Sequence, residues 1–247
     1  MSGYSEFANI YDRLMMDADY EGRSEYIKAL FEKFGKKPSL LLDLACGTGK
    51  FSRIFAKDGI EVIGVDSSEE MLSVAKETAE QEGFNILFLC QEADKLDLYG
   101  TVDGAVCLMD SVNHITDKEI LQKAFDKVSL FLEKDCLFIF DVNTLYKHKE
   151  VLGNNTFVFE EDGVFGVWQN SFDEESATTD IFLDFFEERN ELYKRYSDEF
   201  NERAYSENEL CEMLKKSGFE ILEILGDLKL QKPEFQEERI FFIAKKL

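Results

Sequence analysis

The sequence predicts an α/β fold built on a doubly wound, mostly parallel sheet. Two short apolar runs, residues 40–44 and 60–65, are typical of parallel strands that are covered on both faces. A glycine turn and the helix-forming residues 50–57 lie between them, which is the order of a β-α-β unit. Apolar runs continue to alternate with amphipathic segments along the chain, so we expect helices on both faces of the sheet.

Three segments carry the pattern of a capping box, in which a Ser or Thr and a Glu three residues later satisfy each other's backbone N–H groups. They are residues 67–70, 116–119 and 206–209. We expect each segment to open a helix, and the second of these helices to run to about residue 133. Strands are expected at residues 86–90, 102–109 and 137–140.

The ends of the first two strands carry residues suited to a nucleoside. Gly47 and Gly49 allow the backbone to approach a ligand, because neither has a Cβ atom. Asp66 follows the second strand, where a carboxylate can accept hydrogen bonds from both hydroxyls of a ribose. We therefore expect a nucleoside at this edge of the sheet.

The glycine turn favours a nucleoside with a cationic tail. The dinucleotide fingerprint G-x-G-x-x-G is incomplete, because Ser52 stands where the third glycine belongs. Asp43, at the end of the first strand, would repel a pyrophosphate but attract an ammonium or a sulfonium by a few kcal/mol. S-adenosylmethionine fits this description.

Three segments at strand ends resemble the class I S-adenosylmethionine-dependent methyltransferases: residues 43–49 (DLACGTG), 65–72 (VDSSEEML) and 106–111 (VCLMDS). The likeness covers roughly the first 140 residues and the order of elements to the C-terminus. It implies a Rossmann-like sheet whose last strand, in the pair formed by residues 219–225 and 239–244, is antiparallel. It also implies S-adenosyl-L-methionine as the cofactor.

The resemblance implies which residues bind the cofactor. An acidic side chain at Glu92 would accept from the exocyclic amine of adenine; family members usually carry Asp there, and Asp94 lies close by. A backbone carbonyl near Leu108 would accept from the cofactor ammonium. The full set is Tyr11, Asp43, Ala45, Cys46, Gly47, Gly49, Asp66, Ser67, Met71, Glu92, Ala93 and Leu108.

Three regions are expected along the chain. Residues 1–37 resemble the helical arm that covers the cofactor in many small-molecule methyltransferases, which implies that the Tyr11 hydroxyl contacts the methionine end of the cofactor. The alternative is that the aromatic residues of the arm only pack onto the sheet. Residues 38–145 and 206–247 form the core. Residues 146–205 have hairpin turn signals and many aromatic residues, and we expect an inserted antiparallel β-sheet lid that selects substrate or pairs subunits.

Composition excludes several partners. The net charge is −23, and the 28 basic residues are scattered, so neither DNA nor an anionic membrane is an expected partner. Five cysteines without a C-x-x-C pair indicate a reducing cytoplasm. Two histidines are too few for a His/Cys metal site, and no metal is expected. A monomer and a homodimer both remain open.

Methyl transfer from a sulfonium needs positioning more than catalytic side chains. An amine acceptor needs a free lone pair, whereas a hydroxyl or carbon acceptor needs a base. His114 is the candidate base, and Asp110 and Tyr11 are candidates for orienting the acceptor. The alternative for His114 is a partly exposed histidine just before a helix cap. The N-P-P-aromatic pattern of adenine and glutamine methylation is absent, because residues 109–112 read MDSV.

The sequence therefore predicts a cytoplasmic methyltransferase that acts on a small-molecule amine or hydroxyl. One alternative keeps this enzyme class but takes a protein or a tRNA nucleoside as substrate. A second is a non-catalytic module that binds S-adenosylmethionine. A third, a nicotinamide-dependent reductase, rests on the glycine turn alone.

Overall fold

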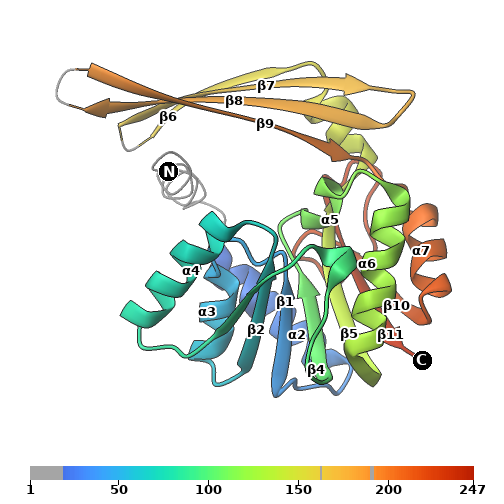
Figure 1. The fold of residues 1–247 in the computed structure, drawn as a ribbon. Coiled ribbons are helices and arrows are strands. Elements are labelled where there is room, and N and C mark those ends of the chain that lie inside the picture. Colours follow the sequence, from blue (N-terminus) through green and yellow to red (C-terminus); the bar gives the residue numbers. More distant parts are fainter. Residues whose placement is uncertain (1–18, 162, 190–191) are drawn as a thin grey trace.

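The computed structural model describes residues 19–161, 163–189 and 192–247. These residues form a seven-stranded sheet and a separate four-stranded sheet (Figure 1). Most of the expected N-terminal arm, including Tyr11, lies outside the described residues.

The seven-stranded sheet is mostly parallel and has the expected antiparallel end. Its order is β10-β11-β5-β4-β1-β2-β3. Strands β1 to β5 pair in parallel, whereas β11 pairs antiparallel with both β5 and β10. This confirms the predicted doubly wound fold. The strands are β1 (Leu40–Leu44), β2 (Glu61–Asp66), β3 (Leu87–Cys90), β4 (Val102–Cys107), β5 (Leu132–Asn143), β10 (Phe219–Gly226) and β11 (Arg239–Lys246).

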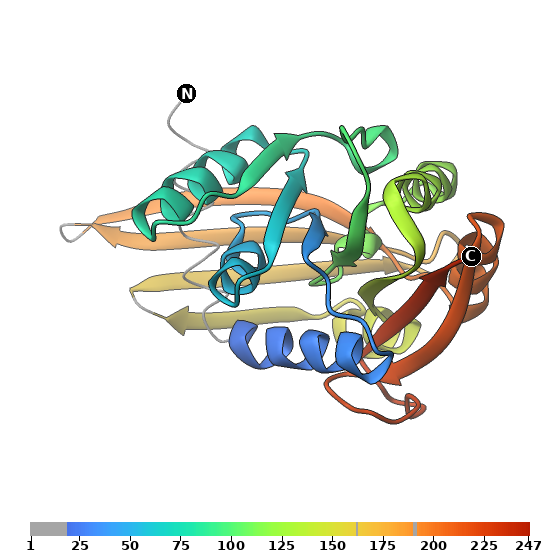
Figure 2. The same ribbon diagram turned by 90° about the horizontal axis from the view of Figure 1, so that it is seen from below.

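Helices cover both faces of this sheet (Figure 2). Successive side chains of a strand point to opposite faces, so Leu41 belongs to the core cluster that contains residues of α2 and α3, while Leu42 belongs to the cluster that contains residues of α6 and α7. Both neighbours are fully buried, which explains why β1 is apolar throughout. The helical elements are α2 (Tyr20–Lys33), α3 (Lys50–Lys57), α4 (Glu69–Gln81), η1 (Ala93–Lys95), α5 (Ser111–His114), α6 (Lys118–Phe131), η2 (Lys147–Leu152) and α7 (Glu207–Lys216).

The order of strands reverses between β1 and β4, because β1 pairs with β2 on one side and with β4 on the other. In an open α/β sheet a ligand binds outside the carboxyl ends of the strands at such a switch point. The residues after Leu44 and after Cys107 therefore flank the expected site.

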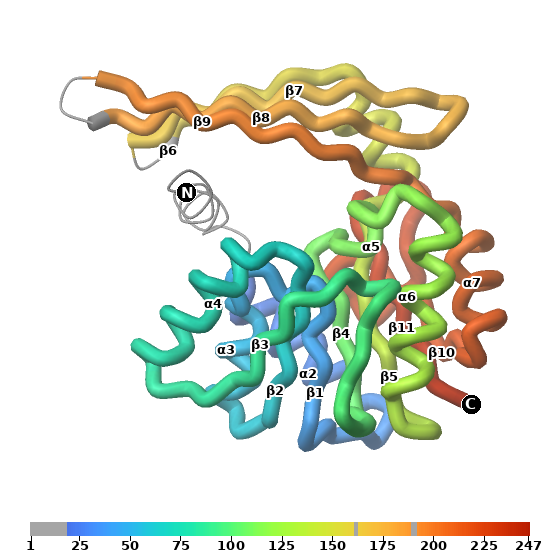
Figure 3. Tube along the Cα trace, in the orientation of Figure 1, coloured from blue at the N-terminus to red at the C-terminus, as the bar shows by residue number. Residues whose placement is uncertain are grey.

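The four-stranded sheet is antiparallel and lies over the edge of the larger sheet that carries α5 (Figures 1 and 3). The chain enters it after η2 and leaves it toward α7. It has a small core of its own around Ile181 and Phe185. The strands are β6 (Thr156–Glu161), β7 (Val164–Asp173), β8 (Thr178–Arg189) and β9 (Leu192–Arg203).

Strand β9 continues past residue 200, where its apolar pattern ends. The ladder with β8 runs on until Arg203 pairs with Thr178, because backbone pairing does not require apolar side chains. This extension carries Glu202.

Two of the three predicted capping boxes are wrong by one residue. The N-cap of α4 is Ser68, whose Oγ accepts from the Met71 N–H at 3.2 Å. The N-cap of α6 is Asp117, which accepts from Glu119 N–H at 2.7 Å, and that helix ends at Phe131. A carboxylate is a stronger acceptor than the Thr hydroxyl before it. Helix α7 has the reciprocal box that the sequence predicts.

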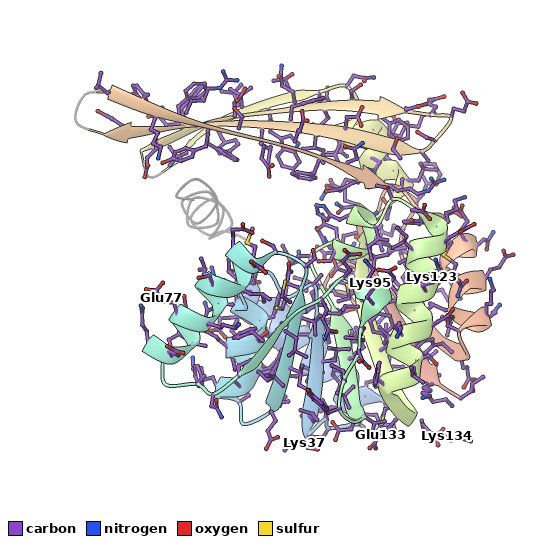
Figure 4. All side chains as sticks on the ribbon, in the orientation of Figure 1. Lys37, Glu77, Lys95, Lys123, Glu133 and Lys134 are labelled. Atoms are coloured by element: carbon purple, nitrogen blue, oxygen red, sulfur yellow. The ribbon has the colours of Figure 1, made fainter. Side chains whose placement is uncertain are left out.

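The body around the larger sheet has charged side chains on its outside. Figure 4 shows Lys37, Glu133 and Lys134 pointing outward at the edge that lies away from the four-stranded sheet. Among the helices of the described ranges, none combines the length and the apolar character needed to cross a bilayer.

Candidate active site

The turn after β1 is a tight loop with one open side. Ala45, Gly47 and Gly49 have φ values of 56°, 55° and 71°, and Cys46 N–H donates to the Val65 carbonyl at 3.0 Å. A Cβ atom placed on Gly47 would meet no atom of the described residues within 4 Å. A Cβ atom placed on Gly49 would lie 2.9 Å from Phe88 Cζ. Gly49 is thus needed for packing, whereas Gly47 leaves its side of the turn open to a ligand.

Asp66 joins the end of β2 to this turn. Its Oδ2 accepts from Gly47 N–H at 2.8 Å, and its Oδ1 accepts from Ser68 N–H at 2.9 Å. Each carboxylate oxygen can accept a further hydrogen bond, because the two oxygens offer about four lone-pair sites. The side chain is therefore held in place and can still accept from the hydroxyls of a ribose.

Asp43 is a buried acid without a cationic partner among the described residues. It is 1% exposed, and Ser52 Oγ donates to its Oδ2 at 2.5 Å. Burial and the nearby charge of Asp66 raise the pKa of Asp43 to about 7, although the Ser52 hydrogen bonds oppose the shift. A cation placed beside Asp43 would stabilise its ionised form. The site therefore fits a cofactor that carries positive charge.

The turn after β4 has an unusual backbone. Met109 and Asp110 have φ values of 58° and 52°, a conformation that costs energy in residues other than glycine. The Asp141 carboxylate of β5 accepts from both of their N–H groups, at 2.8 and 3.0 Å. Arg239 of β11 donates to both Asp110 and Asp141. The Leu108 carbonyl, which accepts from Ser111 Oγ at 2.7 Å, is thus held in a fixed position beside the switch point.

A cluster of acid–base groups lies where this turn meets the four-stranded sheet. His114 Nε2 is 3.6 Å from Glu202 Oε1, and the ring of His114 is 5.0 Å from that of Phe200. Asn143 Nδ2 donates to Asp110 at 2.9 Å and to Glu202 at 3.4 Å. The cluster therefore combines residues from β5, α5 and β9.

Burial and neighbouring charges shift the pKa values of the groups in this cluster in different directions. Burial opposes the ionisation of Asp110, but the Arg239 guanidinium outweighs it and holds the pKa of Asp110 well below its usual range. Burial and the Asp110 charge raise the pKa of Glu202 to about 8. Burial also lowers the pKa of His114, although Asp110 opposes this shift. Near neutral pH the cluster thus contains one ionised and one protonated carboxyl group.

The ligand atoms of Asp110, His114 and Glu202 lie within 4.8 Å of one another. The Arg239 guanidinium already occupies Asp110 Oδ1 at 2.6 Å and would repel a second cation. The arrangement is therefore better suited to holding and moving protons than to binding a metal ion.

The remaining sequence-predicted residues within the described part of the chain follow β2 and β3, the two strands on the side of β1 away from β4. Ser67 is exposed, and Met71 is half-buried at the start of α4. Glu92 is exposed and forms an ion pair with Lys95 at 2.7 Å, and Ala93 begins η1. Tyr11 lies outside the part of the chain that the structure describes.

Several residues that build the cluster were not among the sequence-predicted site residues. Asp141 and Asn143 follow the same rule as Asp66, because they lie at the carboxyl end of a parallel strand. No such sequence pattern marks the other residues. The position of Glu202 depends on the register of β9, that of His148 on η2, and that of Arg239 on β11. Lys147 Nζ donates to Asn143 Oδ1 at 3.0 Å, and His148 Nε2 lies 3.7 Å from Glu202 Oε2. The missed residues are Asp141, Asn143, Lys147, His148, Glu202 and Arg239.

Known proteins resemble this chain along nearly its whole length. A family model described as a methyltransferase domain matches residues 41–135. The protein YqeM of Bacillus subtilis (strain 168) is 33% identical over 98% of this chain and 97% of its own. The crystal structure of an S-adenosylmethionine-dependent methyltransferase from Clostridium acetobutylicum ATCC 824 is 35% identical, covers 98% of both chains and has a TM-score of 0.91.

More distant structures share the fold. CalS10, an amino pentose methyltransferase from Micromonospora echinaspora, is 18% identical over 94% of this chain and 96% of its own, with a TM-score of 0.73. Together with the fold and the strand-end residues, the full-length relatives identify the class of protein. The chain belongs to the class I S-adenosylmethionine-dependent methyltransferases, and S-adenosylmethionine is its cofactor.

Proposed function

We propose that this methyltransferase moves the methyl group to a small molecule whose acceptor atom is an amine nitrogen or a hydroxyl oxygen. The observation that carries the proposal is the position of Glu202. The four-stranded sheet brings this carboxyl group to within 3.6 Å of the His114 imidazole, beside the turn that holds Asp110. The acceptor would lie between the two sheets, where groups able to hold a proton converge.

The chain's own residues supply binding and orientation. Asp66 accepts from the ribose, the open side of Gly47 admits the cofactor backbone, and the ionised form of Asp43 favours its positive charge. Bound S-adenosylmethionine supplies a methyl group that is already electrophilic. Positioning alone can then give effective molarities of about 10⁵ M or more. Asp110 orients the acceptor, and His114 receives its proton.

Charge supports a small acceptor over tRNA. The net charge of −23 disfavours the phosphate contacts on which binding to nucleic acid depends. CalS10, which has the same overall fold, acts on an amino pentose according to its name, so this fold can accommodate a small sugar as acceptor. We further infer a reducing compartment such as the cytoplasm, since the five cysteines are free thiols in the described part of the chain.

An acceptor panel tests the proposal. The purified protein and S-adenosylmethionine are incubated with small amines, amino sugars and alcohols, and in parallel with bulk tRNA and with unfolded protein, while S-adenosylhomocysteine is quantified. We expect turnover with a member of the small-molecule panel. Turnover with tRNA or protein alone would contradict the proposal, and cofactor binding without any turnover would indicate a non-catalytic binding module.

A further inference from the structure

Glu202 lies between the two histidines of the chain. Its Oε1 is 3.6 Å from His114 Nε2, and its Oε2 is 3.7 Å from His148 Nε2. The residues come from three different elements, α5, β9 and η2. Both separations are longer than a hydrogen bond. Groups that each can donate and accept pass a proton once the gaps close to about 2.6–3.2 Å, and such gaps are often long before a substrate binds.

The row has an outer end and an inner end. The side chain of His114 is 44% exposed, that of Glu202 is 6% exposed and that of His148 is fully buried. His148 Nδ1 is 2.8 Å from Thr179 Oγ1, which closes the inner end. At the outer end, no hydrogen bond joins His114 Nδ1 to any residue that the structure describes. His114 Nδ1 can therefore accept a proton from the methyl acceptor.

We propose that His114 and Glu202 form a proton relay in which Glu202 is the final proton acceptor. The bond between the proton and the hydroxyl oxygen or ammonium nitrogen of the acceptor breaks, and a bond from His114 Nδ1 to that proton forms. The Nε2–H bond of His114 breaks, and the proton moves to Glu202 Oε1, so the imidazole is neutral before and after. The freed lone pair bonds to the methyl carbon, while the carbon–sulfur bond breaks and leaves its electron pair on sulfur. This inference rests on the proposed function.

The electrostatics of the cluster suit these two roles. Burial and the Asp110 charge raise the pKa of Glu202 to about 8, so the carboxylate that accepts the proton is the major form at slightly alkaline pH. Burial lowers the pKa of His114, so the imidazole passes a proton on more readily than it keeps one. Asn143 Nδ2 donates to Oε2 of Glu202 and leaves Oε1 facing His114.

Other charged groups also act on the pair, and they define the control. The titratable and charged groups around the pair are Asp66, Asp110, Lys147, His148, Asp198 and Arg239. Asp198 is on the same strand as Glu202 and acts on His114 through its charge. Asp198→Asn therefore removes one carboxylate from β9 without removing the group that faces Nε2. Glu202→Gln removes the group that faces Nε2 and keeps its shape.

The relay assigns Glu202 a role that a purely structural carboxyl group would not have. Nitrogen-15 NMR of the full-length protein saturated with S-adenosylhomocysteine can follow both imidazoles from acid to alkaline pH, because the chain has two histidines and His114→Asn assigns them. In the wild type we expect His114 Nε2 to shift in a step centred near pH 8, the value to which burial raises the pKa of Glu202. Glu202→Gln should lose this step, and Asp198→Asn should keep it.

Two results would overturn the relay. One is a wild-type titration in which His114 Nε2 shows no step besides that of its own protonation, a measurement that requires no folded variant. The other is a step that persists in Glu202→Gln. With an acceptor from the panel, Glu202→Gln should lower kcat at least tenfold and leave the KM for S-adenosylmethionine unchanged. If the panel yields no acceptor, the proposed function fails while the titration still decides whether the two groups are coupled.

Discussion

Arg239 and Asp110 form an ion pair that connects the last strand of the sheet to the turn after β4, with Nη2 2.6 Å from Oδ1. The same guanidinium contacts Asp141, whose carboxylate also accepts from the two left-handed residues of the turn. Three strands thus fix the backbone that presents Asp110 and the Leu108 carbonyl to the site. The final strand is therefore part of the active-site framework.

We expect Arg239→Met to destabilise the protein strongly. The change leaves the Asp141 carboxylate buried and the Asp110 carboxylate partly buried without their cation, and removing one partner of a buried ion pair typically costs about 3–5 kcal/mol. Chemical denaturation with a fluorescence readout measures the free energy of unfolding. Lys245→Met is the control on the same strand, because Lys245 pairs with Glu220 at an exposed position and its loss should change little. Equal stability of the two variants would contradict this role of Arg239.

Gly47→Ala and Gly49→Ala should separate binding from folding. Both residues have positive φ, so each alanine is strained by about 1–2 kcal/mol. At Gly49 the added Cβ also lies 2.9 Å from Phe88 Cζ, and we expect the larger fall in melting temperature there. At Gly47 the added Cβ meets no atom within 4 Å in the part of the chain that the structure describes, so the fold should survive while affinity for S-adenosylhomocysteine falls. Calorimetry of both variants checks this, and a Gly47→Ala variant with full affinity would place the cofactor elsewhere.

Asp43 should make the cofactor-free protein less stable as pH rises. Its folded-state pKa of about 7 lies above the ordinary value of 3.8, so its contribution to stability is complete below pH 3.8 and is lost as pH rises through 7. The loss is at most about 4 kcal/mol. Asp43→Asn removes this titration, so the unfolding free energy of the wild type relative to the variant should fall between pH 4 and pH 8. Parallel curves for the two proteins would show that Asp43 is not held neutral.

Asp66→Ala should weaken S-adenosylmethionine and S-adenosylhomocysteine alike. Both ligands carry the same ribose, and losing hydrogen bonds to a charged group costs about 1.5–3 kcal/mol, or roughly 10- to 100-fold in affinity. Because Asp66 also accepts from Gly47 and Ser68, thermal melting must show that the fold is intact. Glu69→Ala, an exposed acid at the start of α4, is the matched control. Unchanged affinity in a folded Asp66→Ala protein would remove the ribose assignment.

The sequence predicted the features that depend on short stretches of neighbouring residues. Asp43, Asp66 and Leu108 lie at or just beyond the carboxyl ends of apolar parallel strands, and such ends meet at one edge of a sheet. The β-α-β order and the antiparallel insert follow from the periodicity of apolar residues and from turn signals. These features do not depend on knowing which distant segments touch.

Glu202 and Arg239 could not be found in this way. Glu202 lies beyond the apolar part of β9, and its neighbours are decided by a ladder with β8 and by the angle at which the small sheet meets the large one. Arg239 reads as one of many surface charges until the antiparallel register of β11 places it opposite Asn143 on β5. Long-range register is a property of the packed structure and leaves no mark in either segment alone.

The most direct test of a small-molecule acceptor follows the methyl group itself. The enzyme is incubated with S-adenosylmethionine that carries a trideuterated methyl group, together with the acceptor panel, tRNA and unfolded protein in one mixture, and mass spectrometry locates the label. We expect the label in a low-mass amine or alcohol, in an amount equal to the S-adenosylhomocysteine formed. Label in tRNA or protein, or no S-adenosylhomocysteine at all, would contradict the account.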